Sequence, residues 1–296
     1  MISVLICSLN PTLLMQVKKN IKEKIGVEHE ILFTDNSKTN QGICAVYNNL
    51  ALQAKFSYLC FVHEDVLFQT SNWGQKIIKT FSEDAAVGLI GIAGCKYKSS
   101  YFSGWFSNTK QLDCANYIHQ YKQGIETVHL SPSDNNSLQE VVCIDGVFMC
   151  ASKNAWNDNR FNEKFLNGFH FYDIDFSLRI AHSYKVIVTF DVLLTHITEG
   201  GNYGNEWAKI AMHWHKMAGK NLPFSKIEVN RGLADKNIIN ATFDFLKNYN
   251  ISFLNKVKWI VLQKIYLLPS CYYSLMKFIF YRPLRLKYLY KLFRQK

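Results

Sequence analysis

Three residues that can bind metal ions or carry protons follow a strongly apolar segment. Residues 56–68 read FSYLCFVHEDVLF, and His63, Glu64 and Asp65 come directly after the apolar run. A run of aromatic and β-branched residues is typical of a buried parallel strand. Ligands bind at the carboxyl ends of such strands, so we expect these side chains at a substrate site. Carboxylates suit Mg²⁺ or Mn²⁺, and imidazole also suits Mn²⁺. The alternative is a strand followed by a plain polar turn.

Further segments carry residues that could take part in catalysis or bind a ligand. Asp173 and Asp175 lie at the start of a predicted helix, after an aromatic-rich loop. Carboxylates in a first helical turn interact favourably with the helix dipole, but two of them exceed what capping requires. Asp145 and Gly146 interrupt a strand-like segment at 140–151, and a glycine within a strand often marks the close approach of a ligand. His196 precedes a glycine-rich segment.

Strands and helices alternate along the first part of the chain. The hydrophobic patterns predict strands at 2–7, 29–34 and 56–62, with helices at 11–24 and 41–55 between them. Right-handed crossovers would join these elements into a parallel unit. Neither G-x-G-x-x-G nor G-x-x-x-x-G-K-[ST] follows the first strand. This absence disfavours a dinucleotide-binding fold and a phosphate-loop NTPase.

The rest of the chain gives weaker patterns. Residues 97–138 are rich in Tyr, Ser, Asn and Gln, and we expect an irregular region near the site, with or without a short hairpin. The alternative is a surface insertion. His213 and His215 are expected to be ordinary helix residues, because positions i and i+2 do not share a helix face. The remaining predicted helices are 73–81 and 205–216, and the remaining predicted strands are 87–93, 140–151 and 185–190.

The composition is that of a globular protein. A chain of 296 residues suits one large or two small domains, and 48% hydrophobic residues suffice for a core. The eight cysteines form no C-x-x-C pair, and several lie in apolar runs. This usage favours a reducing, cytoplasmic compartment. The first residues lack the basic region of a signal peptide, and no apolar run reaches the ~20 residues that span a bilayer.

The net charge of +11 is concentrated near the C-terminus. Eleven of the 34 basic residues follow Asp244, the last acidic residue, so residues 1–244 hold 23 basic and 23 acidic residues. We therefore expect a domain at 1–220 and a helical, basic, aromatic-rich region at 221–296. Residues 251–296 favour an interfacial helix on an anionic membrane. A helical subdomain packed on the core is the next interpretation, and nucleic-acid binding is the least favoured.

In their order along the chain, these segments resemble a GT-A fold glycosyltransferase of the broad family 2, with the StrF-like branch as the nearest match. The resemblance covers residues 1–215. Two departures stand out. His-Glu-Asp replaces the usual Asp-x-Asp, and Tyr172-Asp173 replaces the usual Glu-Asp pair. The matching segments are ISVLICSLN, ILFTDNS, GICAVYNNLALQAKFSYLCFVHEDV, FHFYDIDFSLR and LLTHITEGG.

The resemblance implies an α/β protein of GT-A type, Rossmann-like, with a mostly parallel sheet, flanking helices and the basic C-terminal extension. It implies an inverting enzyme that moves a sugar from a nucleotide sugar, most commonly a UDP-sugar, to a glycan or lipid-linked acceptor. Such an enzyme would act in cell-surface polysaccharide synthesis at the inner face of the cell membrane. Asp173 would be the general base, with Asp175 as the second candidate. Asp65, His196 and His63 would hold Mn²⁺ or Mg²⁺, and the donor would contact Ser8, Asp35, Asn48, Glu64, Asp145 and Gly146.

Two other functions compete with this hypothesis. The altered Asp-x-Asp motif is compatible with a non-catalytic GT-A-like protein that binds a nucleotide sugar or glycan. A nucleotidyltransferase also places carboxylates and metal at strand ends. It would need a glycine-rich basic loop after the first strand, and the SLNPTLL segment is not one.

Overall fold

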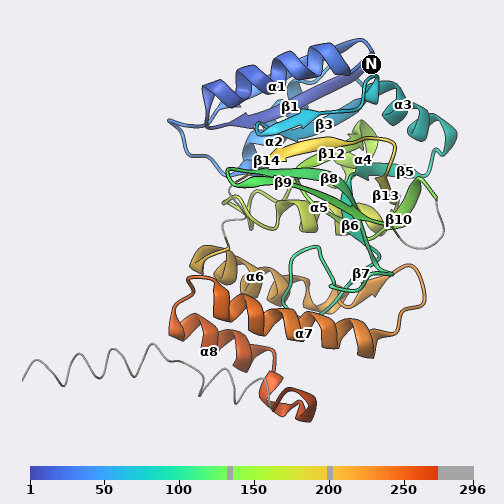
Figure 1. Cartoon of the computed structure of the whole chain (residues 1–296). Coiled ribbons are helices and arrows are strands. Elements are labelled where there is room, and N and C mark those ends of the chain that lie inside the picture. The colour runs from blue at the N-terminus through green and yellow to red at the C-terminus, as the bar shows by residue number, and fades with distance from the viewer. Residues whose placement is uncertain (132–135, 199–202, 273–296) are drawn as a thin grey trace, which may run out of the picture.

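A computed structural model describes residues 1–131, 136–198 and 203–272 (Figure 1). The second half of the basic tail, 273–296, and part of the glycine-rich segment after His196 lie outside the described residues. All eight cysteines are described, and no disulfide joins them.

The first five elements form the parallel unit that the sequence predicts. β1 pairs in parallel with both β2 and β3, so the carboxyl ends of the three strands meet at one edge of the sheet. The α1 helix begins at Pro11, where a missing N–H costs nothing, and the Asn10 side chain caps it. The bounds are β1 Ile2–Ser8, α1 Pro11–Lys24, β2 His29–Asp35, α2 Ile43–Gln53 and β3 Tyr58–His63.

These strands belong to a seven-stranded sheet in the order β10-β13-β5-β12-β3-β1-β2. The predicted α/β class is confirmed, but the sheet is mixed rather than mostly parallel, because β12 runs antiparallel to both β3 and β5. The β12 strand therefore begins where β3 ends. The remaining strands of this sheet are β5 Val87–Gly91, β10 Leu138–Val141, β12 Phe148–Ser152 and β13 Lys185–Thr189.

The single strand predicted at 140–151 is wrong. The segment instead forms three short strands, of which β11, Cys143–Ile144, belongs to a second sheet. The chain crosses between the sheets at Asp145 and Gly146, and the Val147 carbonyl accepts the His63 N–H at 3.2 Å. The break in the strand therefore brings Asp145 and Gly146 to the carboxyl end of β3.

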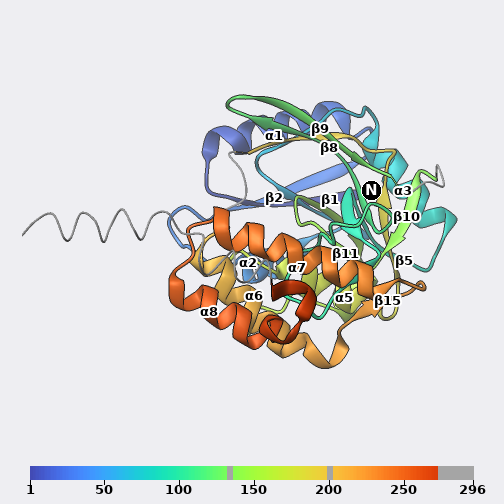
Figure 2. The same ribbon diagram turned by 60° about the horizontal axis from the view of Figure 1, so that its bottom comes forward.

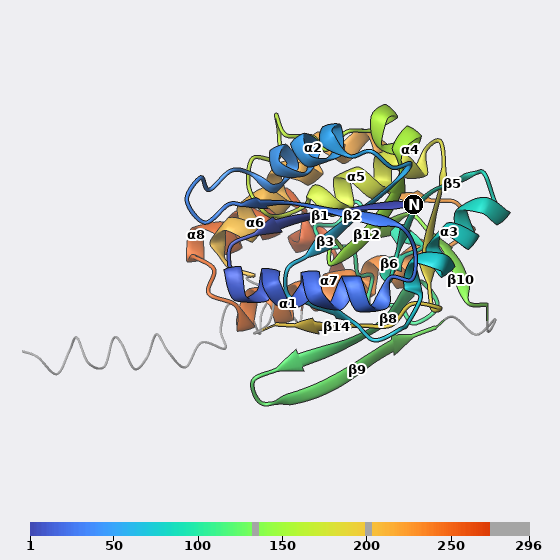
Figure 3. The same cartoon turned by 90° about the horizontal axis from the view of Figure 1, so that it is seen from above.

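The second sheet has the order β11-β6-β8-β14-β4, and β9 pairs with β8. The prediction of an irregular region at 97–138 is wrong for its second half, because β8 and β9 form a long hairpin that projects from the body of the protein (Figure 3). The hairpin shows little hydrophobic alternation because much of it is only partly buried. The strands are β4 Val66–Phe68, β6 Ala93–Cys95, β8 Asp113–Tyr121, β9 Gly124–Leu130 and β14 Leu194–Ile197; a separate pair joins β7 Tyr97–Lys98 to β15 Phe224–Ser225.

Helices cover both faces of the seven-stranded sheet. The α2, α4 and α5 helices lie on one face, and α1 and α3 lie on the other (Figure 3). Alternate residues of β1 follow this division: Leu5 packs in the cluster of α2 and α5, while Val4 and Ile6 pack in the cluster of α1 and α3. The bounds are α3 Trp73–Glu83, α4 Lys153–Asp158 and α5 Tyr172–Ala181.

Three more helices form a layer at the C-terminal side (Figures 1 and 2). Trp214 of α6, Leu246 of α7 and Trp259 of α8 are buried in the same cluster as the α5 face of the sheet. Whether 221–296 is a separate domain stays a prediction. In the described part of the chain, no helix is both long and apolar enough to cross a bilayer. The bounds are α6 Asn205–Ala218, α7 Arg231–Asn248 and α8 Phe253–Leu262, with short 3-10 turns at Gly219–Asn221, Ile265–Leu267 and Pro269–Cys271.

Candidate active site

Three predicted metal ligands meet at one point. His63 ends β3, Asp65 follows it in the turn to β4, and His196 lies on β14, which pairs with β4 so that His196 faces Val66. One ligand atom from each lies within 4.8 Å of the others. Asp65 Oδ2 lies 3.2 Å from His196 Nε2, and Asp65 Oδ1 lies 3.9 Å from His63 Nδ1. We call this group the His-Asp-His cluster.

The electrostatics of the cluster centre on the Asp65 carboxylate. Burial lowers the pKa of His196, but the hydrogen bond and the charge of Asp65 outweigh it, so the pKa is raised. Burial raises the pKa of Asp65, but the hydrogen bond from His196 and the two imidazoles outweigh it, so the pKa is lowered. For His63, burial prevails and its pKa is lowered. The cluster therefore offers a carboxylate and a neutral imidazole, the forms in which both bind metal ions.

The unmet polar atoms of the cluster fit a metal ion. The Tyr172 hydroxyl donates to the Gly146 carbonyl at 3.2 Å and lies 2.7 Å from His63 Nε2. With its single proton directed to Gly146, the hydroxyl accepts from His63 Nε2–H, which leaves a lone pair on Nδ1. That lone pair faces Asp65 Oδ1, a buried atom without a hydrogen-bond donor among the described residues. His63 Nδ1 and Asp65 Oδ1 are both hydrogen-bond acceptors, so neither can donate to the other. A cation bound between them would satisfy both.

Asp173 lies beside this cluster at the start of α5. Its carboxylate accepts the N–H of Gly146 at 3.0 Å and that of Ile174 at 2.9 Å. Burial, and then the charge of Asp145, raise the pKa of Asp173 to about 7. Gly146 has no Cβ, and a Cβ there would collide with the Tyr172 hydroxyl. The glycine that the sequence singles out therefore serves the packing of two site residues.

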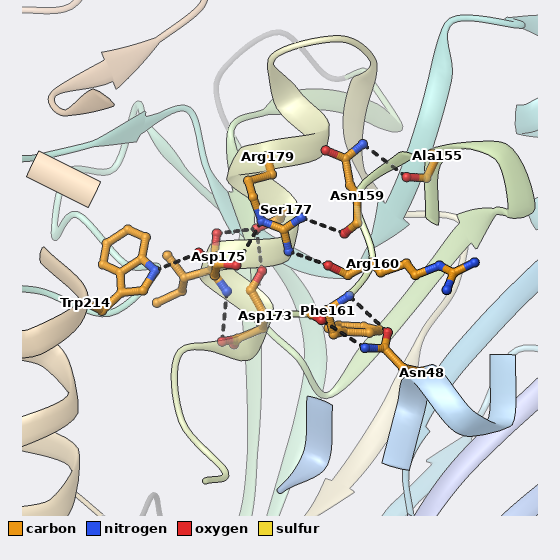
Figure 4. A network of polar contacts seen from close by, with 11 residues as sticks. Asn48, Ala155, Asn159, Arg160, Phe161, Asp173, Asp175, Ser177, Arg179 and Trp214 are labelled. Carbon is orange, nitrogen blue, oxygen red and sulfur yellow. Dashed lines mark hydrogen bonds and ion pairs between the residues drawn. The ribbon is translucent and has the colours of Figure 1, made fainter. Parts of the chain in front are cut away.

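Asp175 occupies a different environment from Asp173 (Figure 4). Its Oδ2 accepts from Arg179 Nε at 2.9 Å, and its Oδ1 accepts from Trp214 Nε1 at 3.1 Å. Its side chain is buried, and it ties α5 to α6. Asp175 is held in an ion pair with Arg179 and by the Trp214 indole, whereas Asp173, among the described residues, accepts only from backbone N–H groups, so the geometry favours Asp173 over Asp175 as a proton acceptor.

A cavity of about 300 Å³, lined by polar and apolar residues, opens on the cluster at the carboxyl ends of the parallel strands. Asn36 shapes one wall: its Oδ1 accepts from Thr39 Oγ1 and the Gln41 N–H, and its Nδ2 donates to the Gln41 carbonyl. We call this space the strand-end cavity. It is lined by Cys7, Leu9, Asn36, Asn40, Gln41, Ile43, His63, Glu64, Asp65, Asn167, Gly168 and Phe169.

The predicted donor-binding residues take three kinds of position. Glu64 lines the strand-end cavity, and its carboxylate accepts from Ser8 Oγ at 2.6 Å and from the N–H groups of Leu9 and Asn10. Ser8 and Glu64 therefore fix the turn that forms one wall. Asp35 is exposed, accepts from Ser37 and does not itself line the cavity. Asn48 does not line it either. It holds the Phe161 backbone at 2.9 and 3.0 Å (Figure 4).

Sequence reasoning missed two residues of the site. Asn36 follows Asp35 in the TDNS segment, so its place at a strand end was the available signal. Tyr172 was noted only as a departure from a Glu-Asp pair. Its hydroxyl joins His63 to Gly146, residues that lie 109 and 26 positions away along the chain. No local pattern reports such a contact.

The fold and the site define a glycosyltransferase of GT-A type. The chain belongs to the family described as "Glycosyltransferase like family", whose model matches residues 3–221. The match does not extend to the StrF-like branch, which stays a prediction. No curated protein sequence matches the chain.

Solved structures are similar in fold at low sequence identity. The crystal structure of GalNAc-T7 with UDP, GalNAc and Mn²⁺ gives a TM-score of 0.50 at 10% identity over 74% of this chain. The chain spans 48% of that protein. The mannosyltransferase PcManGT from Pyrobaculum calidifontis, in complex with GDP-Man and Mn²⁺, gives a TM-score of 0.48 at 11% identity, over 95% of this chain and 87% of that one.

Proposed function

We propose that this protein transfers a hexose from a nucleotide sugar, most commonly a UDP-sugar, to a hydroxyl group of a glycan or lipid-linked acceptor, with inversion at the anomeric carbon. The observation that carries the proposal is the His-Asp-His cluster between the strand-end cavity and Asp173. The family match supports the reaction class. The inverting course, the donor and the acceptor are our proposal.

His63, Asp65 and His196 would hold the divalent cation. Two imidazoles with one carboxylate favour Mn²⁺ over Mg²⁺, which prefers oxygen ligands. A cation bound there supplies Lewis-acid stabilisation of the leaving diphosphate. The Mn²⁺ in the GalNAc-T7 and PcManGT complexes accords with this choice.

The donor would occupy the strand-end cavity. Asn36, Gln41 and Asn167 offer hydrogen-bonding groups for a nucleoside, and Phe169 offers an apolar face. Glu64 and Ser8 would act by holding the turn at Leu9, since their polar atoms already bond to that turn and to each other. A pocket with a few well-placed polar groups is the usual form of such a site.

Asp173 would take the proton from the acceptor hydroxyl. With a pKa of about 7, a substantial fraction of Asp173 is ionised at neutral pH. A pKa close to the working pH is also the most effective one for a general base. Asp145 keeps that pKa high through its negative charge. Asp173 is held at the cluster by the Gly146 N–H, so acceptor and donor would meet with little freedom to lose.

The test is turnover of UDP-, GDP-, CDP- and dTDP-sugars by the full chain, with Mn²⁺, Mg²⁺ or EDTA and a mixture of glycan acceptors. We expect nucleoside diphosphate release with one nucleotide class, dependent on metal and lost in Asp65→Asn. Asp244→Asn, at an exposed position, is the matched control. Metal-dependent nucleotide binding without turnover on any acceptor would favour the non-catalytic alternative.

We also propose that α8 contacts an anionic membrane, which would place the enzyme at a membrane-bound stage of cell-surface polysaccharide synthesis. The buried face of α8 packs through Trp259 and Ile260. The opposite face repeats apolar residues at helical spacing, beside exposed Lys258 and Lys264. Each such lysine contributes about 1 kcal/mol near an anionic surface. The exposed apolar residues are Leu254, Val257, Val261 and Leu262.

Co-sedimentation with anionic liposomes tests the membrane contact. Leu262→Glu, at a side chain 60% exposed, should release the protein from the liposomes. Leu52→Glu on α2, where the leucine is 57% exposed, should leave sedimentation unchanged. Equal sedimentation of both variants would contradict the contact.

A further inference from the structure

A second, larger cavity lies between the β8–β9 hairpin and the C-terminal helices. Its volume is about 470 Å³, and we call it the aromatic cleft. Figure 2 shows the helical layer that forms one wall, and Figure 3 shows the hairpin that forms the other. The lining includes ten aromatic residues: Phe102, Trp105, Phe106, Tyr117, Tyr121, Tyr203, Trp207, Phe245, Tyr249 and Trp259.

The aromatic cleft is linked to the His-Asp-His cluster through His119. His119 lines the cleft and is the register partner of His196 across β8 and β14. The two imidazole rings lie 5.6 Å apart. His63 and Asp65, in contrast, line the strand-end cavity. The cluster thus contributes His63 and Asp65 to the strand-end cavity, and its third member, His196, is the neighbour of a residue that lines the cleft.

The aromatic side chains form a continuous wall. Trp207 lies 5.4 Å from Tyr203, 4.9 Å from Phe245 and 6.0 Å from Trp259, measured between ring centroids. Tyr203 lies 5.4 Å from Tyr249 by the same measure. Such rings offer flat apolar faces together with hydroxyl and indole groups at their edges. A pyranose matches them, because its C–H bonds gather on its faces and its hydroxyl groups stand at its rim.

The charged residues that line the cleft limit the class of ligand further. Among the described residues that line it, none is Lys or Arg, and Glu126 is the one carboxylate. A carboxylate or phosphate group would lose its hydration here without meeting a Lys or Arg side chain among the described lining residues. Neutral polar partners are available from Ser103, Asn108 and Thr242.

We propose that the aromatic cleft binds the acceptor, and that the acceptor ends in a neutral saccharide rather than a uronic acid, a sialic acid or a sugar directly attached to a lipid diphosphate. This inference rests on the proposed function, because a saccharide bound in the cleft is an acceptor only if the protein is a glycosyltransferase. It adds the class of sugar and the residues that select it.

The experiment titrates the full chain, with UDP and Mn²⁺ present, against methyl glucoside and methyl glucuronide, which differ by one carboxylate. Methyl galactoside and methyl mannoside extend the neutral set, and dodecyl phosphate probes the lipid alternative. Saturation-transfer NMR and tryptophan fluorescence report binding, since three tryptophans line the cleft. We expect at least one neutral glycoside to bind tenfold more tightly than the glucuronide.

Substitutions locate the binding. Tyr249→Ala should weaken the neutral glycoside about 3- to 10-fold, and Tyr249→Phe should retain most of the affinity, because the ring supplies the contact. The Tyr249 side chain is 41% exposed, which limits the effect on folding. Tyr266→Ala is the matched control, at a tyrosine 43% exposed that does not line the cleft.

The outcomes separate this inference from the proposed function. If UDP binds but the glucuronide or dodecyl phosphate binds as tightly as every neutral glycoside, the inference fails and the transferase proposal stands. If a neutral glycoside binds in a Tyr249-dependent manner but no nucleotide of the UDP, GDP, CDP and dTDP set binds, the saccharide site stands and its role as an acceptor site falls. Binding of both, with loss in Tyr249→Ala alone, supports the inference.

Discussion

The strand-end cavity and the aromatic cleft lie near the same cluster but are lined by different kinds of side chain. The first is built at the carboxyl ends of β1, β2 and β3, and asparagine, glutamine and carboxylate side chains form much of its wall. The second is built by a hairpin and three helices, and ten aromatic rings line it. The difference accords with our proposal that a charged donor binds in the strand-end cavity and a neutral saccharide acceptor binds in the aromatic cleft. Substitutions in each region should therefore affect different kinetic constants.

The largest expected effect belongs to Asp173, which lines neither region. Asp173→Asn removes the proposed base, and kcat should fall about 10²- to 10⁴-fold, because positioned general-base catalysis contributes that much. The affinities for nucleotide and saccharide should both be retained, since neither cavity is lined by Asp173. Steady-state kinetics with calorimetric binding measure both quantities. Normal turnover in a folded Asp173→Asn variant would refute the base assignment, with Asp244→Asn as control.

The second largest effect is expected on metal binding by the His-Asp-His cluster. Tyr172→Phe removes the hydroxyl that bonds to His63, and the affinity for Mn²⁺ should fall about 10- to 100-fold, as for other residues that orient metal ligands. Electron paramagnetic resonance of free Mn²⁺ measures it directly. Tyr47→Phe is the control, because the buried Tyr47 hydroxyl has no hydrogen-bond partner in the described part of the chain. Equal Mn²⁺ affinity in the two variants would show that Tyr172 does not position His63.

A third substitution separates stability from catalysis. Asp175→Asn breaks the ion pair with Arg179, and the free energy of unfolding should fall by about 2 kcal/mol, in the range of hydrogen bonds to charged groups. The turnover per folded molecule should stay near normal, because the carboxylate faces Arg179 and Trp214. Thermal unfolding and active-site titration measure the two effects. A stable but inactive Asp175→Asn enzyme would move the base role from Asp173 to Asp175.

The smallest expected effect is a change in pH dependence. Asp173 must be ionised to act as a base, so kcat/KM should rise with pH through its pKa of about 7. Asp145→Asn removes a negative charge that raises this pKa, so the acidic limb of the profile should shift to lower pH. The ratio of the rate at pH 6 to the plateau rate should increase a few-fold. A limb that stays in place would show that another group controls it.

The sequence predicts the strand-end cavity far better than the aromatic cleft. The elements of β1, α1, β2, α2 and β3 carry clear alternation of buried strands and amphipathic helices, and their polar ends mark one edge of a sheet. His63 and Asp65 could be placed at a site because they follow a predicted strand, and the resemblance to the glycosyltransferase family added His196 to them.

The aromatic cleft could not be predicted in this way, because its residues line a cavity. In β8 the aromatic residues Tyr117 and Tyr121 line the cleft and are only partly buried. The strand therefore lacks a clear hydrophobic alternation, and its sequence resembles that of an irregular polar segment. Tyr203 and Trp259 reach the same wall from positions 56 residues apart. Only the packing of the helices brings them together. The broken strand at 140–151 has the same cause, since Gly146 accommodates the distant Tyr172.

The most direct measurement is calorimetric titration of UDP, GDP, CDP and dTDP into the full chain, with Mn²⁺ or with EDTA, and into Asp65→Asn. The account predicts that one nucleotide binds with Mn²⁺, and that EDTA and Asp65→Asn each abolish this binding, because the cluster would hold the cation that neutralises the diphosphate. Binding of equal affinity in EDTA, or in Asp65→Asn with Mn²⁺, would contradict the central role of the His-Asp-His cluster.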